Sequence, residues 1–476
     1  MPSTVVTPVL QGPAAALFWY DPGLQEKSWA SKVEGPAAND DIVSFSQLAL
    51  NVFPKMILSR IEPLLDNQLQ AFLAFSAEQV SVMPVQTVGQ APFGAVLGGE
   101  QAQCCVKTGY IHQSPSFVIK VASGGAGHGN TGFLLLFSQK TMKLTKMLMD
   151  EGILTEIRTA AASCLASGLC LGLPASTGAE GGKKGNGAVG LTSSKNPVVT
   201  KIGILGAGVQ AVWQLRLLQR MWSSDAGDER NPLMTFPPVL LWCRDREKGQ
   251  TFINRMRSSD LPGDRAMEIE LASTVAEVFS QCQLVHTLTA SREPLVREVD
   301  LPELAKDASS SRLHITCVGA DSPGKQELEL GVLERADFLL CDSYDQTFHR
   351  GEFQSLFSGR SLPSAEVLSS LRKRSRSLGS MEKDEDRGNN DRGWDADFRE
   401  QLYPLSSTSR SSYNEKDKTS LVKTPIELGI FASNPKQVQH RLGGPSHFSI
   451  FDTSGIAVQD VQIAQLACEM FGVDLS

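Results

Sequence analysis

The sequence lacks several features that mark whole classes of protein. No apolar run approaches the ~18 residues of a membrane-spanning helix, and 132–137 is among the longest. Residues 1–17 have neither a basic region nor a clean apolar core, so we expect no signal peptide. The formal net charge of −7 offers no basic excess, which argues against a nucleic-acid partner or an anionic membrane surface.

Paired metal-ligand and disulfide motifs are also missing. The nine cysteines are scattered, their number is odd, and no Cys-x-x-Cys pair occurs, so we expect reduced thiols in a cytoplasmic protein. The seven histidines show no ligand spacing, and the sequence therefore gives no support for a metal site. With 41% hydrophobic and 20% charged residues, the composition is that of an ordinary globular protein.

The length of 476 residues leaves room for two or three domains. Helical patterning begins near Phe45 and recurs through Leu69–Phe75. Apolar runs then predict an antiparallel or mixed sheet, with strands at 103–111, 116–121, 132–138 and 144–149. Further strands alternate with helical segments, which predicts a doubly wound parallel sheet; they are expected at 198–205, 239–242, 268–271, 284–289, 313–318, 338–341 and 448–451.

Three segments interrupt this pattern. Residues 1–42 are rich in Pro, Ala and Gly and predict a flexible lead-in. Residues 171–197 are rich in Gly, Lys and Ser and predict a flexible surface loop. Residues 359–422 are charged and poor in aliphatic side chains, so they predict a disordered insertion. A last helix, with apolar residues on one stripe from Ala457 to Phe471, is expected to close the fold.

The stretch Val198–Ala211 carries the clearest chemical motif. A short buried strand leads into a turn that spells G-x-G-x-x-A, and an amphipathic helix follows with Leu215, Leu218 and Trp222 on its apolar face. Gly206 permits the tight turn, and Gly208 lets the backbone approach a pyrophosphate at the start of the helix. This context favours a dinucleotide site over a β-α turn that uses glycine for geometry alone.

A second candidate site lies at the predicted start of another helix. We expect Thr155 to be the N-cap, with Glu156 in the first turn. Arg158 then stands where a cation opposes the helix dipole. We interpret Arg158 as holding an anion in front of this helix, and the alternative is a solvated arginine.

Four blocks in this order resemble the ornithine cyclodeaminase/mu-crystallin family: Arg158–Ser163, Gly206–Gln210, Val318–Leu328 and Thr453–Asp460. The resemblance runs from about residue 57 to 472 and implies an α/β fold. It implies a Rossmann doubly wound domain (158–358 plus 423–457) and a smaller α+β substrate and dimerisation domain (43–157 plus 458–476). The resemblance further implies that the last helix returns to the smaller domain and that the protein forms a homodimer.

The resemblance assigns roles to individual positions. Lys120 matches the family's active-site lysine, Arg158 the arginine that pairs with the substrate carboxylate, and Asp321 the catalytic acid/base. The implied cofactor-binding residues are Thr159, Gly206, Ala207, Gly208, Val209, Gln210, Arg244, Thr289, Val318, Gly319 and Gly455. The alternatives are a surface lysine with a buried stem for Lys120 and a helix cap for Asp321. Their expected place at the ligand cleft of an open α/β sheet, together with the family match, favours the functional roles.

Two departures from the family concern the substrate. Gln86 stands where the family usually has an arginine for the carboxylate, which removes one charge-assisted hydrogen bond. We expect Lys107, on the following strand, to substitute as a substrate-binding cation. The loop at 124–131 is also shorter than is usual in the family, where it helps to shape the substrate pocket.

The leading hypothesis is therefore an ornithine cyclodeaminase-type enzyme that converts L-ornithine, or a similar small amino acid, to proline with loss of ammonia. The alternatives are a reductase of cyclic ketimines or a small amino-acid dehydrogenase, and a non-catalytic binding protein of the mu-crystallin kind. We expect NADP(H) in preference to NAD(H), because Arg244 follows the strand 239–242 and an arginine suits a 2′-phosphate. Asp245 follows immediately, so NAD(H) remains open.

Overall fold

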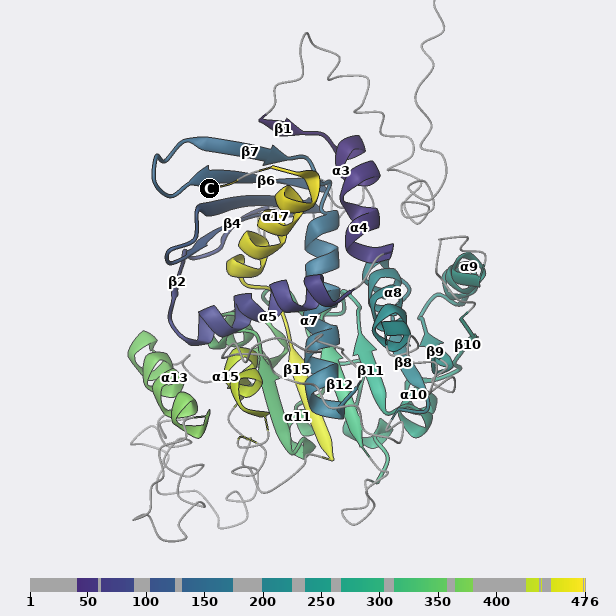
Figure 1. The fold of residues 1–476 in the computed structure, drawn as a ribbon. Coiled ribbons are helices and arrows are strands. Elements are labelled where there is room, and N and C mark those ends of the chain that lie inside the picture. The colour runs from purple at the N-terminus through teal and green to yellow at the C-terminus, as the bar shows by residue number, and fades with distance from the viewer. Residues whose placement is uncertain are drawn as a thin grey trace, which may run out of the picture.

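Two β-sheets organise the chain, and the long helix α7 (Ile153–Leu171) contacts strands of one sheet and the C-terminal helix that covers the other (Figure 1). The computed structural model describes residues 41–58, 61–89, 103–124, 131–173, 199–224, 236–257, 267–303, 312–357, 364–379, 425–435, 438, 447–473 and 475. All but the ends of the predicted lead-in (1–42) and of the predicted loop (171–197) lie outside these residues. The division of the chain into domains stays a prediction, and its boundary at 157/158 falls inside α7.

The first sheet has the strand order β1-β7-β6-β5-β4-β2, with β3 also paired to β4. Its pairs are antiparallel except for β1 with β7, so the sheet is mixed. Side chains along β5 and β6 alternate between a buried and a half-buried face, as a pleated strand requires. The strands are β1 (Ile42–Val43), β2 (Val80–Val82), β3 (Gln86–Val88), β4 (Gln103–Ile111), β5 (Ser116–Gly124), β6 (Thr131–Ser138) and β7 (Leu144–Leu148).

Helix α17 (Ala457–Phe471) covers the buried face of this sheet and packs on α5 (Glu62–Ser76). Four of its predicted stripe residues are buried: Ala457, Val461, Ala464 and Cys468. Figure 1 shows α17 lying against the first sheet, although it directly follows β15 (Phe448–Asp452) of the second sheet. The C-terminal helix therefore returns to the first sheet and brings its own N-terminus beside β4 and β5.

The second sheet is parallel throughout, with the order β10-β9-β8-β11-β12-β15-β13-β14. Apart from the edge strand at 269–271, its strands are largely buried on both faces, which explains their continuous apolar runs. The strand order reverses between β8 and β11, the place where open α/β sheets bind ligands. The remaining strands are β8 (Ile202–Leu205), β9 (Val239–Trp242), β10 (Ile269–Leu271), β11 (Leu284–Thr287), β12 (Leu313–Cys317), β13 (Phe338–Cys341) and β14 (Ile426–Glu427).

Helices cover both faces of the second sheet, as the predicted doubly wound fold requires. Helices α7 and α8 (Val209–Ser224) pack on one face, and α10, α11 and α12 share a core with the other. The apolar face predicted for α8 is buried at Leu215, Leu218 and Trp222. The other helices are α3 (Phe45–Asn51), α4 (Phe53–Leu58), α9 (Arg246–Arg257), α10 (Val275–Gln281), α11 (Leu330–Arg335), α12 (Tyr344–Arg350), α13 (Ala365–Gly379) and α15 (Leu428–Ser433), with 3-10 turns η3 (Glu298–Asp300) and η4 (Glu352–Phe357).

The structure corrects the expectation that residues 359–422 are disordered throughout. Helix α13 lies inside this segment, and the rest of it, apart from Ser364, is outside the described residues. The Arg372 side chain of α13 forms ion pairs with Glu427 and Asp345, each at 2.9 Å. The charge-rich sequence did not predict this helix, because its partner, the buried carboxylate of Glu427, lies in a distant part of the chain.

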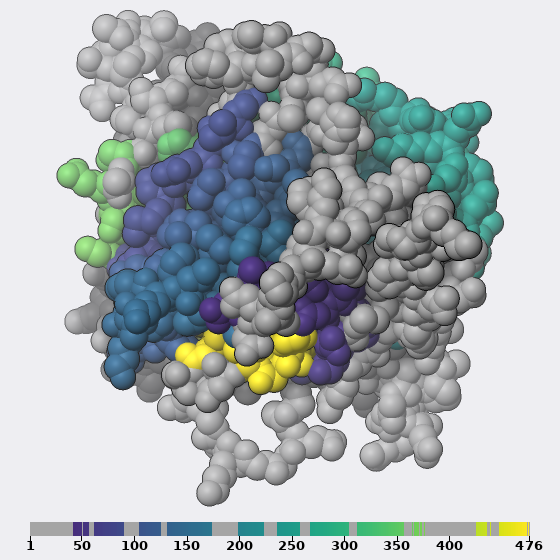
Figure 2. Space-filling model, turned by 90° about the horizontal axis from the view of Figure 1, so that it is seen from above, coloured from purple at the N-terminus to yellow at the C-terminus, as the bar shows by residue number. Residues whose placement is uncertain are grey.

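The outer face of the first sheet is apolar and half-buried. Phe117, Ile119 and Val121 of β5 lie opposite Phe137, Leu135 and Phe133 of β6. The rings of Phe117 and Phe137 stack with centroids 4.9 Å apart. Seen from above in Figure 2, the strands of this sheet (blue) occupy a broad part of the surface, with C-terminal residues (yellow) beside them.

Candidate functional site

Helix α7 begins three residues earlier than predicted, and this changes the position of Arg158 in the helix. Gly152 is the N-cap with φ 85°, and the Asp150 carboxylate accepts a hydrogen bond from the Leu154 N–H at 2.9 Å. Thr155 is therefore not the N-cap, which corrects the prediction. Gly152 and Asp150 thus cap the N-terminus of α7. With Ile153 as the first helical residue, Arg158 lies in the second turn, where it is 3% exposed.

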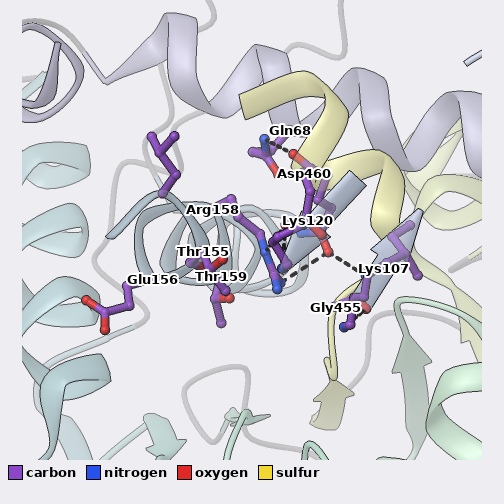
Figure 3. Close-up of polar contacts among 12 residues, drawn as sticks. Gln68, Lys107, Lys120, Thr155, Glu156, Arg158, Thr159, Gly455 and Asp460 are labelled. Carbon is purple, nitrogen blue, oxygen red and sulfur yellow. Dashed lines mark hydrogen bonds and ion pairs between the residues drawn. The ribbon is translucent and has the colours of Figure 1, made fainter. Parts of the chain in front are cut away.

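Arg158 and Lys120 share one carboxylate. Arg158 Nε lies 3.2 Å and Lys120 Nζ 2.8 Å from Asp460 Oδ1, and all three side chains are buried (Figure 3). Burial favours a raised pKa for Asp460, but Lys120 and Arg158 hold the pKa below its usual value. The anion that Arg158 was predicted to hold is thus, in this structure, the side chain of α17. Sequence reasoning missed the role of Asp460, although Asp460 ends one of the four family blocks.

Lys107 completes a cluster of three cations. Lys107 on β4 is the direct cross-strand partner of Lys120 on β5, so both side chains project from the same face of the sheet. Lys107 Nζ donates to the carbonyl oxygens of Gly455 at 2.7 Å and Ser454 at 3.2 Å. Burial, followed by the charges of Lys120 and Arg158, lowers the pKa of Lys107 to about 7.

Gly455 shapes the turn that leads from β15 into α17. Its φ is +84°, and a Cβ there would overlap the guanidinium of Arg158. Its N–H donates to Asp342 Oδ2 at 2.6 Å, while burial raises the pKa of Asp342. Gly455 therefore lies in the cation cluster and lets the backbone come close to Arg158.

The glycine turn after β8 has the geometry that a bound pyrophosphate needs. Gly206 has φ +112°, and a Cβ there would lie 2.8 Å from the carbonyl oxygen of Leu288. A Cβ at Gly208 would meet nothing within 4 Å, so open space adjoins the backbone where α8 begins. Ala207 is buried, and Gln210 reaches the Glu156 carbonyl of α7 at 3.5 Å. These residues fit a dinucleotide, because backbone N–H groups at a helix N-terminus bind phosphate.

Helix α7 connects this turn with the cation cluster. On one side of α7, Glu156 accepts a hydrogen bond from Trp213 Nε1 of α8 at 2.7 Å. On another side, Arg158 faces Asp460. Thr159 is buried, and its hydroxyl donates to the Thr155 carbonyl at 2.8 Å. The first turns of α7 therefore fix the distance between the two candidate sites.

A buried glutamate that sequence reasoning missed fixes the carboxyl ends of β11 and β12. Glu327 accepts hydrogen bonds from the Thr287 hydroxyl, the Thr289 N–H and the Thr289 hydroxyl, each at 2.7 Å, and from the Gly319 N–H at 3.0 Å. A Cβ at Gly319 would overlap the Thr289 carbonyl oxygen. Glu327 thus joins two of the candidate cofactor positions, Thr289 and Gly319, and the Val318 N–H donates to the carbonyl of Thr287, a third partner of Glu327.

Asp321 lies at the same edge but does not contact the cation cluster directly. Its side chain is about half exposed and pairs with Lys325 at 2.6 Å. Its carbonyl oxygen accepts a hydrogen bond from Arg350 Nε at 3.0 Å, and Arg350 Nη2 lies 3.8 Å from Cys105 Sγ on β4. Arg350 therefore links the Asp321 loop to the strand that carries Lys107.

The candidate 2′-phosphate residue lies at the end of β9. Arg244 is exposed, whereas Asp245 Oδ1 accepts a hydrogen bond from the Lys248 N–H at 3.0 Å and caps α9. A carboxylate that caps a helix is less available for a ribose hydroxyl.

Gln86 stands where the family usually has an arginine. It pairs with Val106 of β4, so its side chain projects from the opposite sheet face to Lys107.

The described residues contain no group of three side chains suited to hold a metal ion. All nine cysteines are described, and each is a free thiol. No helix in the described ranges is long and apolar enough to cross a membrane.

Comparison with known proteins supports the family resemblance and the fold. The model of the "Ornithine cyclodeaminase/mu-crystallin family" matches residues 187–376. A protein of Sinorhizobium fredii named an uncharacterized cyclodeaminase is 27% identical over 253 residues, which cover 52% of this chain and 62% of the relative. This chain thus covers less than two thirds of that relative's length.

Solved structures share the fold. The iminosuccinate reductase of Paracoccus denitrificans, in complex with NAD+, has a TM-score of 0.54 and 17% identity, covering 90% of this chain and 95% of that one. A lysine cyclodeaminase described with L-lysine, L-ornithine and L-2,4-diaminobutyric acid has a TM-score of 0.56 and 19% identity, covering 90% and 91%. At these identities the likeness shows the fold alone. Together with the family model, it confirms that this chain resembles the ornithine cyclodeaminase/mu-crystallin family.

Proposed function

We propose that this chain is a nicotinamide-dependent enzyme that acts on the carbon–nitrogen bond of a small α-amino or α-imino acid. The observation that carries the proposal is the cluster of Lys107, Lys120 and Arg158, which α7 joins to a glycine turn suited to a dinucleotide. A buried cation without a carboxylate partner is costly, and an anionic ligand offsets that cost. The carboxylate of an amino acid is such a ligand.

The cofactor proposal rests on the open backbone beside Gly208 and on the Glu327 hydrogen bonds at the neighbouring strand ends. Gly206, Gly208 and the N-terminus of α8 are proposed to hold the pyrophosphate, with Val318 and Gly319 beside the nicotinamide. When bound, the nicotinamide supplies a reversible hydride donor and acceptor. The protein's own residues supply binding, orientation and proton transfer.

We assign the substrate carboxylate to Arg158 and Lys107. Arg158 contacts Asp460 through Nε, and its Nη1 lies 3.5 Å from Gln459 Oε1, so its Nη2 is available to a second carboxylate. Lys107 donates to two carbonyl oxygens and has no carboxylate partner among the described residues. Lys120, which contacts Asp460 directly, orients that carboxylate and thereby fixes Arg158.

We assign proton transfer at the substrate nitrogen to Asp321. Its carboxylate is half exposed at the edge where the nicotinamide is proposed to lie, and Lys325 is its partner in the structure. A single carboxylate can take and return protons in imine reduction, in the reverse dehydrogenation and in cyclodeamination of ornithine, so the substrate panel decides among these reactions.

A substrate panel with both cofactors tests this proposal. We expect the purified protein to oxidise NAD(P)H in the presence of an imino acid, and to reduce NAD(P)+ with the corresponding amino acid. Consumption of ornithine without net cofactor change would instead establish the cyclodeaminase hypothesis. Stoichiometric binding of NAD(P)H and ligand without turnover of any substrate would identify a non-catalytic binding protein.

We further propose a preference for NADP(H). Arg244 is exposed at the end of β9, and the neighbouring Asp245 caps α9. An exposed guanidinium is well suited to a 2′-phosphate. Fluorescence titration is expected to give a lower Kd for NADPH than for NADH in the native protein, and Arg244→Ala is expected to remove the difference. Equal affinities in the native protein would contradict the proposal.

We propose that the protein is a homodimer through the outer face of the first sheet. This face presents six half-buried apolar side chains on β5 and β6, and a contiguous apolar patch of this kind marks an interface with another protein surface. Phe137→Asp is expected to give a monomer by light scattering, while the native chain is a dimer. A monomeric native protein in the same measurement would contradict the proposed homodimer. The predicted cytoplasmic location is tested separately by fractionation.

A further inference from the structure

Arg350 is a buried arginine that lies between the Asp321 loop of the second sheet and strand β4 of the first. It is the last residue of α12, and it is 8% exposed. Its Nε donates to the Asp321 carbonyl oxygen at 3.0 Å, and its Nη2 lies 3.8 Å from Cys105 Sγ. Cys105 precedes Lys107 by two positions on β4, so both side chains project from the same face. The guanidinium therefore lies between the Asp321 loop and the face of β4 that carries Lys107.

The Arg350 guanidinium has no carboxylate partner in the part of the chain that the structure describes. Other arginines differ in this respect, because the buried Arg158 pairs with Asp460 and the half-buried Arg372 pairs with Glu427. A backbone carbonyl and a thiol do not neutralise a buried guanidinium. A tether between Asp321 and β4 would need only a neutral hydrogen-bond donor, so the positive charge calls for a different explanation.

Carboxyl groups near the cluster are already in use. Asp460 accepts from Lys120 and Arg158, while Asp342 accepts from the Gly455 N–H and the Thr453 hydroxyl. Asp150 accepts from the Leu154 N–H. None of them makes a hydrogen bond or ion pair with Arg350. Nor does Gln86 replace the family's arginine on this side, because its side chain projects from the other face of the sheet.

We propose that Arg350 binds a second carboxylate of the substrate, so that this enzyme acts on an imino- or amino-dicarboxylic acid. One carboxylate lies at Arg158 and Lys107, and the side-chain carboxylate lies at Arg350. This inference rests on the function proposed above and specifies its substrate class. In the reductive direction, the imine carbon gains a hydride from NAD(P)H and the nitrogen gains a proton, which gives the amino dicarboxylate and NAD(P)+.

The same arrangement disfavours a diamino acid. The side-chain ammonium of ornithine would lie among Arg350, Lys107 and Lys325, and like charges in a buried site repel each other strongly. A planar carboxylate instead matches the planar guanidinium fork. The proposed substrate and ornithine therefore differ in the sign of the charge that Arg350 must face.

Kinetics provide the first test. Oxaloacetate with excess ammonium forms a dicarboxylic imine in solution, and pyruvate with ammonium forms the matched monocarboxylic imine. We expect the native enzyme to prefer the dicarboxylic imine in kcat/KM. Arg350→Gln is expected to lower kcat/KM for the dicarboxylic imine by about 10- to 100-fold, the effect of one lost charge-assisted contact, and to leave the monocarboxylic imine nearly unchanged. For Arg350→Lys, which keeps the charge, we expect a kcat/KM for the dicarboxylic imine between those of the native enzyme and Arg350→Gln.

Arg335→Gln is the matched control. Arg335 also donates to backbone carbonyls, those of Glu298 at 3.2 Å and Pro302 at 2.9 Å, but it lies on α11 away from the cation cluster. Its replacement is expected to leave the substrate preference unchanged. The proposal would be overturned if Arg350→Gln lowered kcat/KM equally for both imines and Arg350→Lys restored none of the loss. Arg350 would then only join the Asp321 loop to β4.

A binding measurement tests the subsite without turnover. Succinate is expected to raise the Tm of the native protein more than propionate at equal concentration and ionic strength, and Arg350→Gln is expected to abolish this difference. Lack of turnover with every amino and imino acid would contradict the proposed function, and the succinate result would still decide the subsite. Turnover of monocarboxylic imines alone, with no succinate effect, would overturn the dicarboxylate proposal and leave the function standing.

Discussion

Lys107 and Lys120 face each other across β4 and β5, yet only Lys120 has a carboxylate partner. Lys120 Nζ lies 2.8 Å from Asp460 Oδ1, whereas Lys107 Nζ donates only to the carbonyl oxygens of Ser454 and Gly455. Two like charges at adjacent strand positions are destabilising. Lys120 therefore stabilises the fold through its ion pair with Asp460, whereas Lys107 is proposed to bind a ligand.

The first prediction concerns the stability cost of Lys107. Its pKa is lowered from 10.5 to about 7 in the folded chain, first by burial and then by Lys120 and Arg158. The unfolded chain therefore binds more protons between pH 7 and 10.5, and the stability of the native protein rises with pH in that window. Lys107→Met is expected to raise Tm most at or below pH 7, with the gain shrinking toward pH 10.5, while it weakens substrate binding. A pH-independent loss of Tm would contradict this account.

The second prediction concerns Asp460. Asp460→Asn leaves Lys120 and Arg158 buried without a carboxylate, and we expect a loss of about 3–5 kcal/mol in unfolding free energy. Because Lys120 and Arg158 hold the pKa of Asp460 below its usual value, its stabilisation is present above about pH 4 and is lost as the pH falls through the folded pKa. The double variant Asp460→Asn/Lys120→Met is expected to recover part of the loss in urea unfolding. Wild-type stability in the single variant would contradict the ion-pair account.

The third prediction separates two glycines of one turn. Gly206→Ala is expected to destabilise the fold, because φ is +112° and the new Cβ would lie 2.8 Å from the Leu288 carbonyl oxygen. Gly208→Ala meets nothing within 4 Å in the free protein and is expected to keep its Tm, but to raise the Kd for NADPH. Thermal melts and fluorescence titration measure the two effects. Unchanged NADPH affinity in Gly208→Ala would place the pyrophosphate elsewhere.

The fourth prediction concerns Asp321. Asp321→Asn keeps the shape of the side chain but removes its proton affinity, so turnover is expected to fall by about two to four orders of magnitude. The fold and the NADPH Kd are expected to stay unchanged, since the side chain is half exposed. Lys325→Met, which removes the partner and keeps the carboxylate, is the matched control and is expected to retain far more activity. A fully active Asp321→Asn protein would exclude the aspartate from proton transfer.

Much of the fold follows from local sequence pattern. Apolar runs predicted β5 and β6, and the G-x-G-x-x-A turn after a short apolar strand predicted β8 and α8. The short strands β1, β2, β3 and β14 were missed, because two or three residues carry too little periodicity to stand out. Helix α13 was also missed, because its partner Glu427 lies 55 positions away.

The sequence by itself determined which residue types the site contains: the glycine turn, Arg158 and Asp321 stand in family blocks whose order is visible along the chain, and Lys120 matches the family's active-site lysine. Only the tertiary structure decided how their charges are arranged. Asp460 reaches Arg158 across 302 positions, Arg350 reaches Cys105 across 245, and Glu327 reaches Thr289 across 38. Burial makes each charge depend on its nearest partner, and that partner is set by how α12, α17 and the sheets pack, which no local pattern records.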